Sequence, residues 1–392
     1  MAKKVGIEVS LAVSEAVQAA DVDVIAAYPI TPQTHIVEHL SELVANGELD
    51  AEFVPVESEH SAMSLCIGSS AAGARTYTAT SSQGLALMHE ILYIAPALRT
   101  PIVMTVANRS LSGPISIWND HSDVMSERDC CWIQTFAENG QEAFDLTLHA
   151  FKVAEHPDVL LPVMVNLDGF TLSHMIEPIE IMDQSEAKKY LKPYIPKLVL
   201  DPQHPVTMGG VGIPAVYTEA KKQFESAITA SKKVIVEAWK EFDKMYGRKY
   251  QPIETYKTKG AEIVLLTMGS ISETAMTAVD RMRDKGILVG LMRFRLWRPF
   301  PLQEFQRGVK GIKTLAVVDR AISYGAQGGP VYIEVKSALY NQTDRPQVFG
   351  FVAGLGGRDV TVDTFEEIVT KATQYSKKGK GPVYEMIGVK EK

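Results

Sequence analysis

Cysteine is scarce in this sequence: Cys66, Cys130 and Cys131 are the only three among its 392 residues. Three cysteines are too few for a disulfide framework, and the adjacent Cys130 and Cys131 cannot easily bridge each other, so a reducing compartment is expected. The same count excludes an iron–sulfur cluster or a structural zinc held by four thiolates of this chain alone. If the protein takes part in electron transfer, other chains must carry the electrons. No role is assigned to Cys130 or Cys131.

The chain also lacks an excess of positive charge and any long hydrophobic run. Forty lysine and arginine residues stand against 47 acidic ones, which gives a net charge of −7, and the basic residues are scattered. Nucleic acid is therefore not an expected partner. Apolar stretches such as 91–98 and 159–165 fall far short of the roughly 20 residues that a membrane span needs, and no export signal is visible. We expect a soluble, cytoplasmic protein with no membrane partner.

Several familiar catalytic motifs are absent. The sequence has no Walker lysine after a glycine-rich loop and no H-E-x-x-H, G-x-S-x-G or C-x-x-C pattern, so kinase, zinc-protease and hydrolase functions have no support. Residues 210–215 fit a loose G-x-G-x-x-A pattern, but no strong strand precedes them and Pro214 disturbs the turn. No metal-binding residue is predicted in this chain.

What the sequence does contain is a regular alternation of strand and helix patterns. In residues 5–175, short apolar runs alternate with helical stretches, as is typical of an α/β domain, with strands expected at 22–27, 53–56, 76–80, 102–107 and 162–166. Residues 175–250 are proline-rich and end in a long amphipathic helix at 216–246. We assign them to the first domain, 1–250, as an excursion and connector. A second α/β domain is predicted over 251–392.

Polar residues follow several predicted strands of the first domain, namely Thr31, Glu59, Arg109 and the Asp120-His121 pair. In a parallel sheet such positions share the carboxyl edge, where ligands bind. Each also has a purely structural interpretation. Thr31 could cap a helix, and Ser58 could cap the next helix with Glu59 in its first turn. Arg109 could pair with a surface acid, and Asp120 could cap a turn.

Seven motifs occur in order along the chain. Five lie in the first domain: Ala27-Tyr28-Pro29-Ile30-Thr31-Pro32, Val56-Glu57-Ser58-Glu59-His60-Ser61-Ala62-Met63, Ala79-Thr80-Ser81-Ser82-Gln83-Gly84-Leu85, Asn108-Arg109-Ser110-Leu111 and Leu167-Asp168-Gly169-Phe170. Two lie in the second: Phe294-Arg295-Leu296-Trp297-Arg298-Pro299-Phe300-Pro301 and Gly354-Leu355-Gly356-Gly357-Arg358-Asp359-Val360. Over nearly the whole chain the sequence resembles the α subunit of pyruvate:ferredoxin oxidoreductase, of the 2-oxo acid:ferredoxin oxidoreductase family. The resemblance implies an α/β fold: a thiamine-diphosphate-binding pyrimidine-type domain, followed by a transketolase C-terminal-like α/β domain.

The resemblance also assigns a role to each candidate residue. Thiamine diphosphate becomes reactive when a carboxylate shares a proton with its aminopyrimidine ring, and Glu59 matches that carboxylate. Arg109 and the hydroxyl of Thr31 match the groups that hold the carboxylate of a 2-oxo acid. Pro29 matches a position that contacts the cofactor. Ile115 and Ile117 match positions that line the pocket around the apolar end of the substrate.

The sequence contains no Gly-Asp-Gly motif, through which thiamine enzymes hold the diphosphate by way of Mg²⁺. The resemblance therefore implies that this chain holds only the pyrimidine half of the cofactor and that a β subunit supplies the diphosphate and Mg²⁺ site. The [4Fe-4S] clusters are expected in partner chains, with γ and ferredoxin-like δ subunits among them. In the second domain, Gly325-Ala326-Gln327-Gly328-Gly329 favours close packing at the start of a helix over a phosphate-binding loop.

The implied reaction is the oxidative decarboxylation of pyruvate with coenzyme A to acetyl-CoA and CO2, or the reverse synthesis, with ferredoxin as electron partner. A branched-chain or aromatic 2-oxo acid, such as 2-oxoisovalerate or phenylglyoxylate, is an alternative substrate. Oxalate is not expected, because a relative that uses it would carry an arginine at the place of Thr31. Two other functions stay open: a non-catalytic assembly subunit, and a transketolase or decarboxylase without electron transfer.

Overall fold

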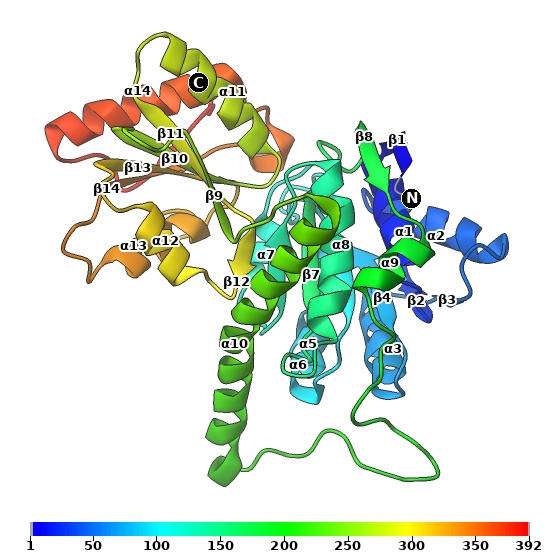
Figure 1. The fold of residues 1–392 in the computed structure, drawn as a ribbon. Helices are drawn as coiled ribbons and strands as arrows, with labels where there is room; N and C mark the ends of the chain where they lie inside the picture. Colours follow the sequence, from blue (N-terminus) through cyan, green and yellow to red (C-terminus); the bar gives the residue numbers. More distant parts are fainter. Residues whose placement is uncertain (1–2, 391–392) are drawn as a thin grey trace.

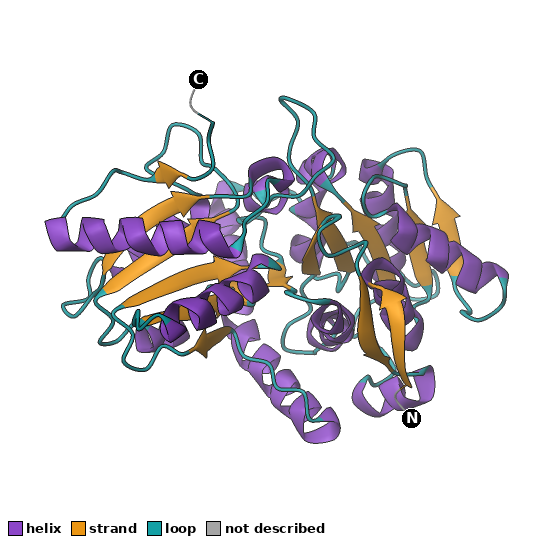
Figure 2. Ribbon diagram, turned by 90° about the horizontal axis from the view of Figure 1, so that it is seen from above, coloured by secondary structure: helices purple, strands orange, loops and turns teal. Residues whose placement is uncertain are grey.

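The computed structural model describes residues 3–390, in which two mainly parallel sheets of seven and six strands stand side by side (Figure 1 and Figure 2). A separate antiparallel pair, β1 (Lys3–Glu8) and β8 (Ile176–Ile181), flanks the first sheet. Within residues 3–390, no helix is both long and apolar enough to cross a membrane. The α/β fold class predicted from the sequence is confirmed.

The first sheet carries the strand ends that the candidate residues follow. Its order is β12-β6-β7-β5-β4-β2-β3, and all neighbours are parallel except β12 and β6. The strands are β2 (Val24–Ala27), β3 (Glu52–Pro55), β4 (Thr76–Thr80), β5 (Val103–Asn108), β6 (Ile133–Phe136), β7 (Val163–Asp168) and β12 (Leu296–Arg298). All five strands predicted for this half are present and pair in parallel, so the prediction of a parallel sheet is confirmed.

Helices pack on both faces of the first sheet. One face is covered by α1 (Val9–Ala19), α2 (Thr34–Ala45) and α8 (Gly140–Ala154). The other is covered by α3 (Glu59–Ala71), α4 (Ser82–Leu87), α5 (His89–Leu92), α6 (Ile94–Leu98) and α7 (Ser122–Ser126). Parallel strands need such crossover connections, which fix the order in which the loops meet at the carboxyl edge.

Strand β6 and helix α8 were not predicted from the sequence. A start signal for α8 is present, because the side chain of Asn139 accepts a hydrogen bond from the backbone N–H of Glu142 at 3.0 Å. The body of the helix, however, is buried almost all round and includes the polar residues Asp145 and His149. Phe144, Leu148 and Phe151 nevertheless recur at helical spacing, so the sequence carries a signal for α8 that the prediction did not use.

The connector contains α9 (Gln184–Tyr190) and the long α10 (Pro214–Tyr246), which confirms the helix predicted at 216–246. Proline at the first helical position and Gly247 at φ 71° mark its two ends. Trp239 and Phe242 bury the C-terminal half against the first unit. The N-terminal half projects beyond the rest of the molecule (Figure 1).

The second sheet has the order β15-β14-β13-β10-β11-β9, parallel except where β9 meets β11. Its strands are β9 (Ile253–Tyr256), β10 (Ile263–Met268), β11 (Val289–Phe294), β13 (Thr314–Asp319), β14 (Gln347–Val352) and β15 (Glu385–Met386). One face packs on α11 (Ile271–Asp284) and α14 (Val362–Lys378), and the other on α12 (Leu302–Gly308) and α13 (Pro330–Leu339). A short 3₁₀ helix, η1 (Leu355–Gly357), follows β14.

The two units share structure across residue 250. Strand β12 belongs to the second half of the chain, yet it extends the first sheet by pairing with β6. One apolar core also continues from Met63 and Trp132 in the first unit to Phe294 and Phe305 in the second. The second unit is therefore held firmly against the carboxyl edge of the first, where the candidate residues lie.

Candidate active site

Thr31, Glu59 and Arg109 follow β2, β3 and β5, three strands of the first sheet. Because the strands are parallel, their following loops meet at one edge, as the sequence predicted. Glu59 is the first residue of α3, whose N-cap is Ser58, and the Ser58 hydroxyl accepts a hydrogen bond from the Ser61 N–H at 3.3 Å. The structural interpretation of Ser58 is thus confirmed, and this cap fixes the position of Glu59.

The Glu59 carboxyl group is buried, with 6% of the residue exposed, and forms no ion pair among residues 3–390. It lies against Gly84, where a Cβ atom would stand 2.5 Å from Glu59 Oε1 and 2.5 Å from Thr80 Oγ1. The hydroxyl of Thr80 is buried and has no hydrogen-bond partner within the described chain. Burial raises the pKa of Glu59, with only a backbone hydrogen bond acting against it. A carboxyl group that holds its proton this readily suits proton sharing with a ring nitrogen.

The Arg109 guanidinium connects three loops of the same edge. Its Nη1 donates to the carbonyl of Thr31 at 2.8 Å, and its Nε donates to the carbonyl of Ser116 at 2.9 Å. Its Nη2 donates to Gln83 Oε1 at 3.3 Å, next to Gly84. Arg109 is only 7% exposed and forms no ion pair within residues 3–390, so the surface-pair interpretation is wrong. Burial lowers its pKa, but a guanidinium stays charged near neutral pH and can receive an anion.

The structure brings Thr31 to Arg109 through its backbone carbonyl, while the residue itself is exposed. It does not cap the next helix, because α2 has Gln33 at its N-cap position and no side-chain cap bond. Pro29 is exposed in the same loop. Gln83, which sequence reasoning did not single out, joins the two parts of the site, since it bonds to Arg109 and precedes the glycine that Glu59 faces.

The loop of residues 110–121 folds back over Arg109. Ile115 and Ile117 flank Ser116 and are 76% and 42% exposed, so their side chains are available to a ligand or a partner chain. Asp120 accepts from the Ser122 N–H at 2.9 Å, which confirms its turn-capping role. It also accepts from the Gly356 N–H at 3.2 Å, so the second unit supports this loop.

A second carboxylate at this edge, Asp168 at the end of β7, is bound by neighbouring groups of the protein on both of its oxygens. His121 Nε2 lies 2.8 Å from its Oδ1, while Arg320 Nη1 and the Ser270 N–H each lie 2.8 Å from its Oδ2. The Arg320 and His121 contacts hold the pKa of Asp168 well below its usual range despite complete burial. This group, which we call the Asp168 joint, ties the two sheets together.

The glycine-rich segment of the second unit packs at a helix start, as predicted. Asp319 accepts hydrogen bonds from the N–H groups of Val331 and Tyr332, at 2.8 and 3.0 Å, in the first turn of α13. A Cβ atom at Gly329 would lie 2.2 Å from Asp319 Cγ. The glycine is needed for this close approach.

A cavity of about 990 Å³ lies elsewhere, between α10 and the second unit, and Cys130 and Cys131 are among its lining residues. Its lining does not include Glu59, Arg109 or Thr31. All three cysteines are free thiols. Burial raises the pKa of Cys131 to about 11, so this thiol is protonated and a poor nucleophile near neutral pH.

Comparison with known proteins bears on this site. Residues 15–240 match the family described as pyruvate flavodoxin/ferredoxin oxidoreductase, thiamine diphosphate-binding, and residues 261–365 match pyruvate:ferredoxin oxidoreductase core domain II. The pyruvate synthase subunit PorA of Pyrococcus horikoshii is 52% identical over 91% of this chain and 90% of its own length. That of Thermotoga maritima is 50% identical over 91% of both. The ketoisovalerate oxidoreductase subunit VorA of P. horikoshii is 44% identical over 92% of this chain and 91% of its own.

Two solved structures share the fold. A 2-oxoglutarate:ferredoxin oxidoreductase from Magnetococcus marinus superposes with a TM-score of 0.72 at 19% identity, over 94% of this chain but only 65% of that chain. An inactive β4 tetramer of a split-gene transketolase gives a TM-score of 0.57 at 11% identity, over 94% of this chain and 99% of that one. These likenesses confirm the predicted architecture. This chain spans about two thirds of the length of the 2-oxoglutarate:ferredoxin oxidoreductase chain.

Proposed function

This chain belongs to the pyruvate:ferredoxin oxidoreductase family, and on that premise we propose that it is the α subunit of a thiamine-diphosphate-dependent 2-oxo acid:ferredoxin oxidoreductase. The proposed reaction converts pyruvate and coenzyme A to acetyl-CoA and CO2, passing two electrons to ferredoxin, or runs in reverse. The observation that carries the proposal is the buried Glu59 carboxyl group, which forms no ion pair within residues 3–390 and faces Gly84 and Thr80.

The residues around Glu59 fit the aminopyrimidine half of the cofactor. The unpartnered Thr80 hydroxyl and the Glu59 carboxyl group, which both lie close to Gly84, are polar groups that a flat polar ring can use. Thiamine diphosphate, when bound, supplies a carbon nucleophile for the 2-oxo carbonyl. Glu59 would share a proton with the ring nitrogen, and its burial favours the protonated form that this role needs. Pro29, in the loop after β2, is proposed as a further cofactor contact.

The substrate would lie beside Arg109. Its guanidinium is already oriented by the carbonyls of Thr31 and Ser116, so an incoming carboxylate meets a fixed charge. The Thr31 hydroxyl would assist at the same carboxylate. Ile115 and Ile117, on either side of Ser116, would contact the apolar end of the substrate.

Partner chains would complete the enzyme. The sequence has no Gly-Asp-Gly motif, so a β subunit would hold the diphosphate and Mg²⁺. Three free cysteines cannot ligate a [4Fe-4S] cluster by themselves, so the clusters would lie in partners such as γ and ferredoxin-like δ subunits. The exposed Ile115 and Ile117 are consistent with a site that a second chain covers.

Pyruvate is favoured as substrate because the pyruvate synthase relatives reach 52% identity, against 44% for the ketoisovalerate enzyme subunit. A branched-chain 2-oxo acid is the second candidate. Purified complex should be assayed for coenzyme A-dependent ferredoxin reduction with pyruvate, 2-oxoisovalerate and phenylglyoxylate. The proposal expects the highest kcat/KM for pyruvate, and a preference for 2-oxoisovalerate would assign the second candidate.

The catalytic assignment is tested by Glu59→Gln in the assembled complex. An amide cannot exchange the carboxyl proton with the ring, so turnover should fall by about 10² to 10⁴ while the cofactor stays bound. The matched control is Glu57→Gln: Glu57 lies two residues earlier, is exposed, and accepts a hydrogen bond from the Ser61 hydroxyl at 2.5 Å. Activity of Glu59→Gln within threefold of the parent, with full cofactor occupancy, would favour a non-catalytic assembly subunit.

A further inference from the structure

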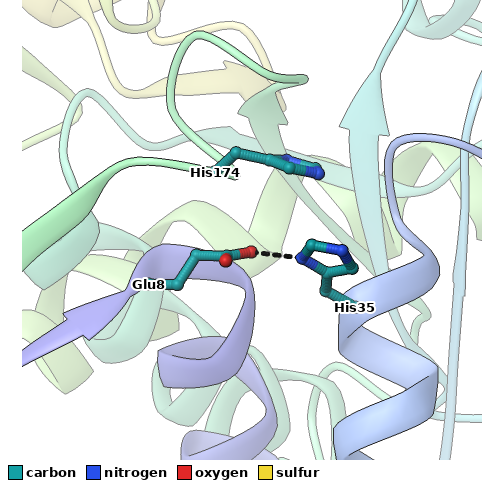
Figure 3. A group of neighbouring side chains, drawn as sticks. All are labelled: Glu8, His35 and His174. Atoms are coloured by element: carbon teal, nitrogen blue, oxygen red, sulfur yellow. Dashed lines mark hydrogen bonds and ion pairs between the residues drawn. The ribbon is translucent and has the colours of Figure 1, made fainter.

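Glu8, His35 and His174 form a cluster beside the β1/β8 pair, outside the candidate active site (Figure 3). Glu8 ends β1, His35 is the second residue of α2, and His174 precedes β8. Each offers one ligand atom, and these atoms all lie within 4.8 Å of one another. The sequence predicted no metal-binding residue here, because 27 and 139 positions separate neighbouring members, far beyond any local ligand spacing.

The ligand types suit a transition metal rather than Mg²⁺ or Ca²⁺. Two imidazole nitrogens and one carboxylate oxygen are a common protein ligand set for Zn²⁺, with a fourth position left for water. Mg²⁺ and Ca²⁺ prefer oxygen ligands. His35 Nδ1 and Glu8 Oε1 are 2.7 Å apart, a hydrogen bond in which an ion would take the place of the proton.

The backbone around the cluster is fixed without any metal. The N–H groups of Val9 and Ser10 donate to the carbonyls of Met175 and Ser173, both at 2.9 Å, so Glu8 and His174 sit on segments that are already joined. On the other side, the Ser14 hydroxyl of α1 donates to the carbonyl of Ile36 at 2.9 Å, which sets the start of α2. The three ligands are therefore held near one another by the fold.

The rings are also oriented by neighbouring groups. The Ser173 hydroxyl lies 2.8 Å from His174 Nδ1, and a proton held on that nitrogen leaves Nε2 with its lone pair for a ligand bond. The rings of His35 and His174 have centroids 4.5 Å apart, and the Phe170 ring packs on His174 at 4.7 Å. The His35 side chain is 43% exposed, so an ion can enter from solvent.

We propose that Glu8, His35 and His174 bind one divalent ion of the zinc class. The ion joins α2 to the segment that follows β7. Both border the candidate active site, since a Cβ atom at Gly169 of that segment would lie 2.5 Å from Pro32 Cγ in the Thr31 loop. The site is structural: it fixes the position of the Thr31 loop without touching the substrate.

A neighbouring pair, Glu15 of α1 and His39 of α2, provides an internal control. Glu15 Oε1 lies 2.9 Å from His39 Nε2, and His39 follows His35 by one turn of α2. Glu42 approaches the opposite ring nitrogen, Nδ1, at 3.6 Å, so the two carboxylates cannot share one ion with His39. The Glu15 and His39 pair has the same chemistry as Glu8 and His35 but lacks a second imidazole.

The test is titration of the metal-free full chain with Zn²⁺ by calorimetry and with Co²⁺ by visible absorption. One equivalent should bind at micromolar concentration or below, and Co²⁺ should show a tetrahedral spectrum without thiolate bands. His174→Ala and Glu8→Gln should each weaken binding by more than about 100-fold, beyond the 10- to 100-fold typical of losing an outer hydrogen bond. His39→Ala should bind like the parent.

Circular dichroism and thermal unfolding establish that each variant is folded, and His35→Ala serves as a further ligand variant. Zn²⁺ should raise the unfolding temperature of the parent and of His39→Ala but not of His174→Ala, because only a bound ion stabilises the native state. Absence of stoichiometric binding by the parent, equal binding by His174→Ala, or loss of binding in His39→Ala would overturn the proposal. None of these measurements depends on turnover, so they are independent of the proposed function.

Discussion

Glu59 and Asp168 are both buried carboxyl groups at the carboxyl edge of the same sheet, but the protein treats them in opposite ways. Asp168 is surrounded by Arg320, His121 and Ser270, and its pKa is held far below the usual range. Among the residues that the structure describes, Glu59 forms no ion pair, and burial raises its pKa. Burial alone therefore does not identify a reactive carboxyl group.

The difference separates a structural carboxyl group, Asp168, from a reactive one, Glu59. At Asp168 the chain supplies every donor itself, and the result is a joint between the two units. At Glu59 the chain places the carboxyl group close to Gly84 and Thr80. No other side chain within residues 3–390 donates a hydrogen bond to it. A buried carboxyl group that has a shifted pKa and no ion-pair partner is typical of a functional site. A carboxylate whose ion pairs are complete is typically structural.

The largest expected effect comes from breaking the joint. Asp168→Asn removes the charge that balances the buried Arg320, and leaving one partner of a buried pair costs about 3–5 kcal/mol of unfolding free energy. Urea unfolding followed by tryptophan fluorescence measures the loss. Because the native pKa of Asp168 is lowered, its contribution is present above its unfolded value near 3.9, and the loss should persist from pH 5 to 8.

The control for this prediction is Asp319→Asn. Asp319 is equally buried, but it accepts two backbone N–H bonds at 2.8 and 3.0 Å, and burial raises its pKa to about 7. Asparagine keeps an acceptor for only one of these two N–H groups, so the loss of unfolding free energy should be about 1–3 kcal/mol, less than at Asp168. Equal losses of unfolding free energy in the two variants would show that the Asp168 joint contributes no more to stability than the Asp319 contacts do.

The close contact between Glu59 and Gly84 is tested by Gly84→Ala. The added Cβ would stand 2.5 Å from Glu59 Oε1, so the carboxyl group must move, at a cost of about 1–3 kcal/mol in stability and with a marked loss of turnover. Gly68→Ala is the control, because no atom lies within 4 Å of its Cβ position in α3. That substitution should leave turnover unchanged and stabilise the helix slightly.

Arg109→Lys separates the geometry of the guanidinium from its charge. Lysine cannot reproduce the planar fork, so kcat/KM for pyruvate should fall by about 10- to 100-fold, or ~1.4 to 2.7 kcal/mol, with unchanged cofactor occupancy. Arg99→Lys is the control, since Arg99 also donates to two backbone carbonyls but lies at the opposite end of β5. Parental kinetics for Arg109→Lys would leave only a charge requirement at that position.

The smallest expected effect is on stability in Glu59→Gln. A raised native pKa means that the Glu59 carboxyl group costs stability once the pH exceeds its unfolded pKa, so its removal should stabilise the chain at pH 7. Solvent at the open edge screens this penalty, so the gain should be at most about 1 kcal/mol and should vanish near pH 4. Differential scanning calorimetry at both pH values measures it, and a loss of stability at pH 7 would mean that Glu59 has a stabilising partner.

Much of the site could be predicted because its residues follow strands. Thr31, Glu59 and Arg109 each occur just after an apolar run, and parallel pairing alone brings such positions to one edge. Gln83 could not be predicted as the link between Arg109 and the contact of Glu59 with Gly84, since nothing local distinguishes it from a surface glutamine. Helix α8 was missed although its Phe144, Leu148 and Phe151 recur at helical spacing.

The sequence by itself determined the α/β class, the family and the candidate residues of the active site, because strand periodicity and linear motifs are local properties of a chain. Only the tertiary structure decided that Glu59 forms no ion pair among the described residues while Asp168 has several partners. It also decided that Glu8, His35 and His174 meet, although up to 139 residues separate neighbouring members. The physical reason is that the pKa of a carboxyl group and the ligand set of a metal depend on distances of a few ångströms between side chains. Long-range packing sets those distances, and no local pattern records them.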